Sequence, residues 1–451
     1  MLLWGVACWA FFQYAYPCHL FYQEQNQLFL LTPEYVGSYF PERGGVARLV
    51  GDFLTQFYYY RYAGAVILAL CLLATVGLWH LAFRRLGVHR LLSLTVSLLA
   101  GTLLVVGSFS ETFRLWSVVA VAGWALLLVV ATLPRRRWQQ ALLFLLCLPL
   151  GYRLFYLPQM PRLQAPNLDL EKVLATDCEY YFGNYNRVVD MVKGEQRPLT
   201  DQLFYYNLVQ AQRGALPDHL LDFYPNELGT FQHIGPDAPL LRIKSINELY
   251  WTLGDMTYTE RAAMMACVFS AENRNVRMIR RLAECSLVRG DSVAAQKFLG
   301  LLRHTVAHRR WAATAPRSPL YAAKQRLANT QDTIAIGDNA HFIMMQLLDS
   351  NGDNTPCLDY MLCSLLLLKD MQGFKRDYDR YCSQRPRPKR LYQEALCICL
   401  AATNAPAEEW EKYIVSRDVI TRFGQYSRQR GSRQFKDTYW YYYDKITAPK
   451  I

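Results

Sequence analysis

The chain has 451 residues, of which 52% are hydrophobic, and a formal net charge of +12. This length has room for two or three units of ordinary domain size, and near residue 160 the composition changes from strongly apolar to mixed. Basic residues flank the apolar runs and are mixed with Asp and Glu further on. This distribution argues against the one-sided basic stripe of a nucleic-acid-binding protein.

The first 21 residues are apolar and aromatic, and their number is close to the roughly 20 residues that cross the hydrocarbon core of a bilayer. The run from Met1 to Phe21 has neither the basic start nor the small-residue cleavage site of a secretory signal peptide. We therefore expect that this run is retained as a membrane anchor. Alternatively, translation starts a few residues upstream of Met1.

Residues 22–61 form a polar connector in which Pro33 and Pro41 break regular structure and Gly44-Gly45 predicts a turn. From Val46 to Tyr60 the apolar residues recur at helical spacing, and the segment ends in three tyrosines. This pattern is typical of an amphipathic helix that lies in the membrane interface. The alternative is that the segment extends the next membrane span.

Further apolar runs follow up to residue 157 and bring the expected number of membrane spans to about five. They are Tyr62 to Phe83, Leu91 to Ser108, Phe113 to Leu133 and the shorter Ala141 to Leu157. The loops that contain Arg84-Arg85 with Arg90, and Arg135-Arg136-Arg137, concentrate positive charge and are cytoplasmic by the positive-inside rule. Residues 1–157 are then a transmembrane domain of a bacterial inner membrane, with connector 22–61 and the C-terminal domain in the periplasm.

Residues 158–169 are a proline-rich linker, and residues 170–451 show helical patterns without a credible alternation of strands. Small residues around Gly290-Asp291 are similar to a tetratricopeptide unit, in which two antiparallel helices pack closely. Glycines at 183, 214, 254 and 290 follow helical patterns and are 31, 40 and 36 residues apart, near the roughly 34 residues of that repeat. Two further helix pairs are expected, with turns at Lys369-Asp370 and Asn404-Ala405-Pro406.

The predicted fold class is therefore all-α: an N-terminal bundle of about five transmembrane helices, followed in residues 170–451 by a tetratricopeptide-like α-solenoid of helical hairpins. Each hairpin leaves an apolar face that a neighbouring hairpin can cover, which favours the solenoid over an irregular helical bundle.

Three stretches of the chain resemble an uncharacterised Bacteroidota family of multi-pass inner-membrane proteins with a tetratricopeptide-like C-terminal region. They are Glu24-Gln25-Asn26-Gln27 with Leu28-Phe29, the segment from Gly44-Gly45 to Gln56-Phe57, and Thr438-Tyr439-Trp440-Tyr441-Tyr442-Tyr443. The resemblance spans most of the chain and implies architecture and location only.

Glu24, Glu34 and Asp52 are the candidate catalytic residues, because all three lie in the connector at the predicted membrane edge. The position of Glu24 is similar to that of an acid in the first external loop of polyprenyl-phosphate-dependent glycosyltransferases, which acts there with a metal. The chain has too few spans for that class and no second acid beside Glu24. A solvated polar role is therefore the default interpretation.

No metal or cofactor site is expected from the remaining polar residues. His304 and His308 have the i, i+4 spacing that turns two imidazoles on one helix toward the same metal, but a polar helix end explains them without a third ligand. Cys397 and Cys399 have no second cysteine pair and fit a buried structural role.

Aromatic residues beyond residue 170 occur at helical spacing, and most of them fit the core between stacked hairpins. Those on a concave face would bind an extended protein partner, because aromatic side chains give a large contact area at low entropic cost. The candidate binding residues are Tyr181, Tyr205, Tyr250, Trp251, Tyr439 and Trp440. For Tyr439 and Trp440 the alternative is a cap over the last hairpin.

The sequence thus predicts a membrane-anchored scaffold that contacts the lipid bilayer and binds a protein partner in the cell envelope, without nucleic acid or cofactor. The alternative is a membrane enzyme that acts on a lipid-linked or glycan substrate. A small transporter fits less well, because few charged residues lie inside the apolar runs.

Overall fold

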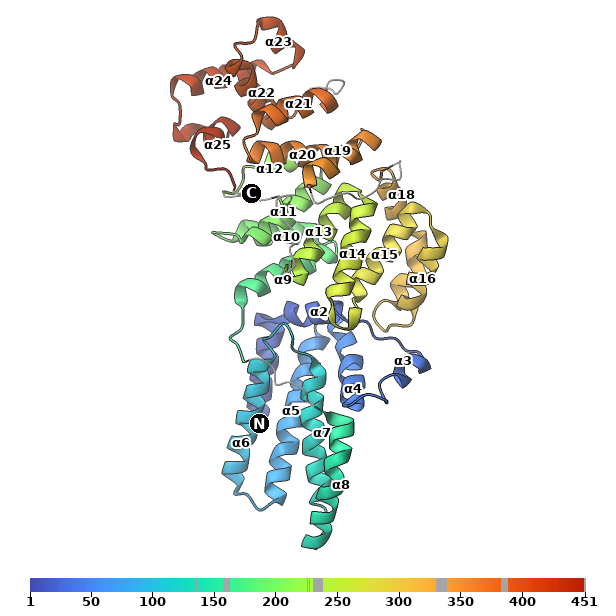
Figure 1. Cartoon of the computed structure of the whole chain (residues 1–451). Helices are drawn as coiled ribbons and strands as arrows, with labels where there is room; N and C mark the ends of the chain where they lie inside the picture. Colours follow the sequence, from blue (N-terminus) through green and yellow to red (C-terminus); the bar gives the residue numbers. More distant parts are fainter. Residues whose placement is uncertain are drawn as a thin grey trace. The chain divides into compact units, whose positions relative to one another are not determined.

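The computed structural model describes residues 1–134, 136–156, 163–224, 226, 228–229, 238–329, 339–382 and 388–449. In these ranges all regular secondary structure is helical, so the predicted all-α class is confirmed (Figure 1). The chain forms two compact units. Unit 1 consists of Met1–Cys178, Cys267–Ala283 and Ser292–Ser318, and unit 2 of Glu179–Ala266, Glu284–Asp291 and Pro319–Ile451. Arg135 and residues 157–162, where the predicted transmembrane domain meets its linker, lie outside the described residues.

The first apolar run bends before its predicted end. Helix α1 (Leu2–Ala10) continues as a π-helical turn (Phe11–Ala15), and the chain then breaks at Tyr16 before α2 (Pro17–Gln25). Pro17 explains the break, because it has no N–H to donate and it disfavours a helical conformation of the preceding residue. The predicted span from Met1 to Phe21 is therefore continuous only to Ala15, and α2 buries its polar residues Gln23 to Gln25 in unit 1.

Four long helices pack side by side in unit 1 (Figure 1). They are α5 (Ala63–Arg85), α6 (Arg90–Gly107), α7 (Leu115–Ala131) and α8 (Arg137–Phe155), and their bounds agree closely with the predicted apolar runs. By length and composition α5 and α6 could each cross a membrane, whereas α7 and the run Leu2–Ala15 are shorter apolar helices.

The amphipathic helix predicted from Val46 to Tyr60 is present as α4 (Gly45–Thr55), which is followed by a 3-10 turn (Gln56–Tyr59). Its buried face carries the small residues Ala47, Gly51 and Thr55, one every four positions, and α4 packs against α7. A Cβ atom on Gly51 would lie 2.3 Å from the Cα atom of Trp116, so this close approach requires glycine. Helix α4 is thus a packed element of unit 1 and separate from α5.

Helix α9 (Leu168–Tyr181) is joined to α2 through Glu171. The two carboxylate oxygens accept hydrogen bonds from the backbone N–H groups of Cys18, at 2.6 Å, and His19, at 3.0 Å. These N–H groups belong to the first turn of α2, where a helix has no internal acceptor for them. Burial raises the pKa of Glu171 to about 7, although both hydrogen bonds favour the ionised form.

A buried ion pair joins three distant segments of unit 1. Arg277, near the start of α15 (Val276–Arg289), is 2% exposed. Its guanidinium donates to the two oxygens of Asp177 at 2.7 and 2.8 Å, and to Oε1 of Gln25 at 2.9 Å. The start of α15, the end of α9 and the end of α2 therefore meet at one charge pair.

Unit 1 also contains α3 (Pro33–Gly37), α16 (Ser292–Arg303), α17 (Arg309–Thr314) and the 3-10 turns Ala271–Asn273 and Ala315–Arg317.

Within unit 2 consecutive helices pack as pairs, for example α10 (Tyr185–Gly194) with α11 (Thr200–Gln212), and α20 (Thr355–Leu367) with α21 (Met371–Cys382). The predicted chain reversals are present, since Gly183, Gly214, Gly254, Gly290, Lys369 and Asn404 all have positive φ. The other helices are α12 (Leu216–His219), α13 (Leu240–Leu253), α14 (Met256–Phe269, mostly in this unit), α18 (Pro319–Gln325), α19 (Ala340–Ser350), α22 (Arg390–Ala402), α23 (Ala407–Lys412), α24 (Arg417–Arg428) and α25 (Tyr439–Lys445), with a 3-10 turn at Arg433–Phe435.

The aromatic residues of α25 cover the end of α20 in unit 2. Tyr439 donates its O–H to the carbonyl of Leu366 at 2.8 Å, and Tyr442 donates to the carbonyl of Leu367 at 2.6 Å. Carbonyls in the last turn of a helix have no N–H partner four residues on inside the helix, and these phenols donate to two of them.

Replacement of Arg277 by Met should lower the free energy of unfolding by about 3–5 kcal/mol, because it removes the guanidinium that pairs with the buried Asp177 carboxylate. The measurement is denaturant unfolding of the full chain in detergent. Arg289→Met is the matched control, because Arg289 forms a solvent-accessible pair with Glu260 and should cost no more than about 1 kcal/mol. The double change Arg277→Met with Asp177→Leu should recover most of the loss. Equal stability of the two arginine variants would contradict this expectation.

The stability of unit 1 should fall as the pH rises from about 4.5 to about 7. The folded protein binds the Glu171 proton more tightly than the unfolded chain does, because the pKa is raised from 4.5 to about 7. The contribution of Glu171 is therefore complete below pH 4.5 and is lost by pH 7, an effect on the order of 3 kcal/mol. Melting temperatures across this range should show a flatter pH profile for Glu171→Gln than for the wild type, and an unchanged profile for the exposed neighbour variant Asp169→Asn. A wild-type slope retained in Glu171→Gln would refute the assignment.

Candidate functional site

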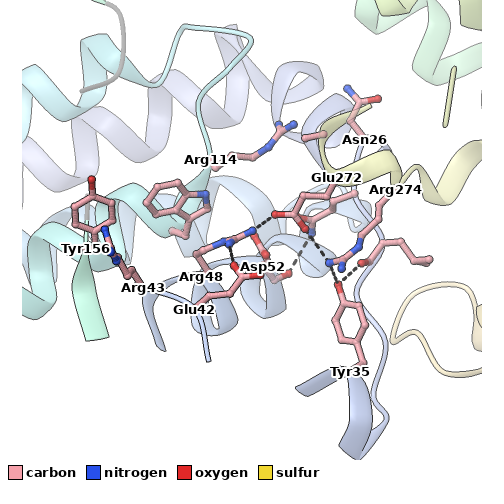
Figure 2. A pocket seen from close by; sticks show the side chains of 14 residues that line it. Asn26, Tyr35, Glu42, Arg43, Arg48, Asp52, Arg114, Tyr156, Glu272 and Arg274 are labelled. Carbon is pink, nitrogen blue, oxygen red and sulfur yellow. Dashed lines mark hydrogen bonds and ion pairs between the residues drawn. The ribbon is translucent and has the colours of Figure 1, made fainter. Parts of the chain in front are cut away.

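Unit 1 contains a pocket of about 450 Å³, which we call the connector pocket (Figure 2). It lies between the connector, the first turn of α7, the residue that follows α8 and the turn Ala271–Asn273. Its lining residues are Asn26, Gln27, Leu28, Tyr35, Glu42, Arg43, Arg48, Asp52, Arg114, Trp116, Tyr156, Ala271, Glu272 and Arg274.

The turn before α4 is attached to the end of α8. Gly44 has φ +73°, which favours glycine, and its N–H donates to the carbonyl of Arg153 at 2.9 Å. The Arg153 guanidinium donates in turn to the carbonyls of Phe40 and Pro41, both at 2.9 Å. These three hydrogen bonds fix the rim of the connector pocket that carries Glu42 and Arg43.

Asp52 is held in the pocket by two phenol groups. Tyr39 donates its O–H to Oδ2 of Asp52 at 2.9 Å, and its oxygen is 3.2 Å from that of Tyr35. Arg274 donates to the Tyr35 oxygen at 2.7 Å, and its guanidinium lies 4.8 Å from the centre of the Tyr35 ring. Burial raises the pKa of Asp52, although the Tyr39 hydrogen bond and the nearby charges of Arg48, Arg114 and Arg274 oppose the shift. The Asp52 carboxyl therefore takes up a proton more readily than an exposed aspartate.

Glu272 connects two of the pocket arginines. Arg48 forms ion pairs with Glu42 and Glu272, and Arg274 pairs with Glu272 at 2.9 Å (Figure 2). Glu272 and the next residue, Asn273, both have φ 56°, in the left-handed region that residues with a side chain rarely adopt. Such backbone strain persists only where surrounding contacts hold it, and it is concentrated at functional sites.

The other two pocket arginines, Arg43 and Arg114, form no direct ion pair with a carboxylate among the described residues, although the charge of Asp52 acts on Arg114 from nearby. Arg43 donates to the O–H oxygen of Tyr152 at 2.7 Å and lies 5.3 Å from the centre of its ring. Half-buried Arg114 immediately precedes α7, and its hydrogen bond within the described part of the chain is a long contact of 3.5 Å with the carbonyl of Phe113. The positive end of the α7 dipole reinforces its charge.

The connector pocket therefore has four guanidinium groups and three carboxyl groups, one of which has a raised pKa. Guanidinium groups form paired hydrogen bonds with phosphate and carboxylate oxygens. A helix N-terminus such as that of α7 also favours a negative group. The chemistry of the pocket is thus suited to an anion.

The three predicted acids have different surroundings. Asp52 lines the connector pocket, and Glu34 is exposed on α3. Glu24 is buried, and its Oε1 lies 3.0 Å from Nε2 of His308. The Glu24 Oε2 and His308 Nδ1 atoms are also buried and have no hydrogen-bond partner in the described ranges. A catalytic role for any of the three acids stays a prediction.

The prediction that His304 and His308 lie on one helix is wrong. The two residues lie between the end of α16 at Arg303 and the start of α17 at Arg309, with His304 exposed and His308 buried. Among the described residues, no group of three or more His, Cys, Asp and Glu side chains is placed to hold a metal ion.

The candidate aromatic binding residues mostly lie inside unit 2. Tyr205, Tyr250, Trp251, Tyr439 and Trp440 are buried, and Tyr181 is half-buried. In this structure they act as packing residues. This agrees with the alternatives given for them, which were core packing between hairpins and, for Tyr439 and Trp440, a cap over the last hairpin. A binding role stays a prediction and requires that they become accessible.

Cys397 is buried and Cys399 half-buried, and both are free thiols.

Sequence reasoning did not identify most of the connector pocket. The spacing of Ala47, Gly51 and Thr55 is a signal that could have indicated close packing of α4, because small residues four positions apart allow helices to approach. Glu272 and Arg274 lie more than 200 residues after Asp52, and nothing local to them indicates that they share its site.

Comparison with known proteins identifies the family of the chain. A family described as "Family of unknown function (DUF6057)" matches residues 1–157 and 155–446. No curated protein and no solved structure matches the chain. The predicted resemblance to an uncharacterised family is confirmed at this level, and the chain belongs to the DUF6057 family.

Proposed function

We propose that this chain is a membrane-anchored protein that binds a phosphate-bearing anion in the connector pocket. The observation that carries the proposal is Arg114, a half-buried guanidinium at the N-terminus of α7 that lines the pocket and forms no direct ion pair among the described residues, although the charge of Asp52 acts on it from nearby. A charge held out of bulk water is costly unless it is paired, and a bound anion would supply the pair.

The distribution of charge around Arg114 favours the same ligand. Arg48 and Arg274 already share Glu272, and the pKa of Asp52 is raised, so the carboxyl groups of the pocket compensate its arginines incompletely. Arg43 adds a second guanidinium without an acidic partner in the described ranges. A phosphate can accept hydrogen bonds from two such groups at once.

Membrane anchoring is part of the proposal. The apolar lengths of α5 and α6 support it, as do exposed leucines on α6 and α8, such as Leu91, Leu99 and Leu145. We propose about five spans in a bacterial inner membrane, formed by the run Leu2–Ala15 and by α5, α6, α7 and α8. The arginine-rich loops would then be cytoplasmic, and the connector pocket would face the periplasm.

A scaffold that binds an envelope protein is the second candidate function. The paired helices of unit 2 and the left-handed residues at their turns favour it, because hairpins of this kind stack into tetratricopeptide-like α-solenoids. In-cell photocrosslinking from half-buried Tyr181 should recover one defined envelope protein. Recovery of background species alone would end this proposal.

A membrane enzyme acting on a lipid-linked substrate is the remaining alternative. Asp52 would be its acid–base group, because it lines the connector pocket and takes up a proton more readily than an exposed aspartate.

Arg114→Gln should weaken the binding of glycerol 3-phosphate to the full chain in neutral detergent by about tenfold or more, because it removes a charged hydrogen-bond donor from the pocket. Isothermal titration calorimetry at low ionic strength measures this change, and added salt should weaken wild-type binding. Arg417→Gln is the matched control, since Arg417 is exposed in unit 2 and should have no effect. Wild-type affinity in Arg114→Gln, or no binding by the wild type, would refute the proposed function.

A further inference from the structure

We propose that the anion in the connector pocket is the head group of a lipid whose hydrocarbon chain lies along α8 and fills a second, apolar pocket between α7 and α8. This inference rests on the proposed function and names its ligand class.

The second pocket has a volume of about 300 Å³ and lies entirely within unit 1. Its lining comes from the middle of α7, the middle of α8 and one residue of α5, and includes Val121, Leu127, Leu128, Phe144, Cys147 and Leu148. Its apolar character suits a hydrocarbon chain.

The two pockets lie along the same pair of antiparallel helices. The thiol of Cys147 donates to the carbonyl of Leu127 at 3.7 Å, and the indole N–H of Trp124 donates to the carbonyl of Phe155 at 2.9 Å. Leu127, in the second half of α7, is therefore opposite the middle of α8, and Trp124, in the middle of α7, is close to the end of α8. Trp116, at the start of α7, and Tyr156, which follows α8, both line the connector pocket.

Close helix packing separates the pockets inside the α7–α8 interface. A Cβ atom on Gly151 would lie 2.4 Å from the ring of Trp124, and one on Gly123 would lie 2.3 Å from the ring of Phe155. A ligand that reaches both pockets must therefore run over the outer surface of the helices at this level.

A stripe of side chains on α8 provides that outer route. Phe144, Leu148 and Tyr152 are four residues apart and are 45%, 42% and 43% exposed, so they lie on one accessible face of the helix. Phe144 and Leu148 line the apolar pocket, and Tyr152 contacts both Arg43 and the ring of Tyr156 in the connector pocket. The stripe thus connects the two pockets.

The composition and length of the stripe fit one leaflet of a bilayer. Its tyrosines are at the end nearest the arginines, as expected at head-group level, and its apolar residues are at the other end. From Phe144 to its end at Phe155 the helix rises about 16 Å at 1.5 Å per residue. This is close to half of a hydrocarbon core of about 30 Å, the depth that one lipid chain occupies.

The experiment compares two probes with the same phosphate group, glycerol 3-phosphate and dioleoyl phosphatidic acid. Binding of each to the full chain in neutral detergent is measured for the wild type, Leu127→Trp and Cys147→Phe. Both variants fill the apolar pocket and should weaken phosphatidic acid binding by about tenfold through lost chain contacts, while glycerol 3-phosphate binds as in the wild type. Leu145→Trp is the matched control, because Leu145 is 64% exposed on α8 and does not line the pocket, and it should bind both probes normally.

The outcomes distinguish this inference from the proposed function. Wild-type affinity for phosphatidic acid in both pocket-filling variants would overturn the lipid inference, and so would a wild type that binds phosphatidic acid no more tightly than glycerol 3-phosphate. Neither result bears on the proposed function, which is tested by the loss of glycerol 3-phosphate binding in Arg114→Gln. If Leu127→Trp binds neither probe because it is misfolded, the binding of the two probes by Cys147→Phe tests the lipid inference.

Discussion

The buried pair of Arg277 and Asp177 is the interaction on which the candidate site depends. Removing both groups from water is costly, and two short hydrogen bonds between them, together with one to Gln25, help to offset that cost. The pair fixes the start of α15 beside the ends of α2 and α9. Backbone hydrogen bonding from Val276 to the carbonyl of Gln27 extends the same junction. The turn that carries Glu272 and Arg274 lies just before α15, so its position over the connector follows from a contact outside the pocket.

The connector pocket combines fixed groups with incomplete charge compensation. Hydrogen bonds from Tyr39 and Arg153, and the ion pairs of Arg48, determine where its carboxyl and guanidinium groups lie. The ion pair between Arg48 and Glu272 also holds one of the two left-handed residues, Glu272 and Asn273. An anion that entered such a pocket would find Arg48 and Arg274 already positioned, so little of the binding free energy would be spent on ordering these two side chains.

The sequence predicted what depends on local pattern. Apolar length identified α5 to α8, helical spacing identified α4, and glycine at positions such as Gly254 identified chain reversals that require positive φ. It failed where one residue overrides a pattern, as Pro17 does by ending the first run at Ala15. It also failed where contacts join distant segments: Glu24 and His308 are 284 residues apart, and no local property of either indicates their pairing.

Asp52 is the one candidate acid that lines the connector pocket. All three candidate acids lie in one connector, yet the fold buries Glu24 beside His308, exposes Glu34 and directs only Asp52 to the pocket. The residues that surround Asp52 are chiefly arginines and phenols, which are suited to bind charge and hold it in place. Since a carboxyl group with a raised pKa repels an incoming anion less than an ionised one does, the burial of Asp52 and the arginines of the pocket act in the same direction. The physical argument therefore favours recognition of an anionic ligand over acid–base catalysis at this position.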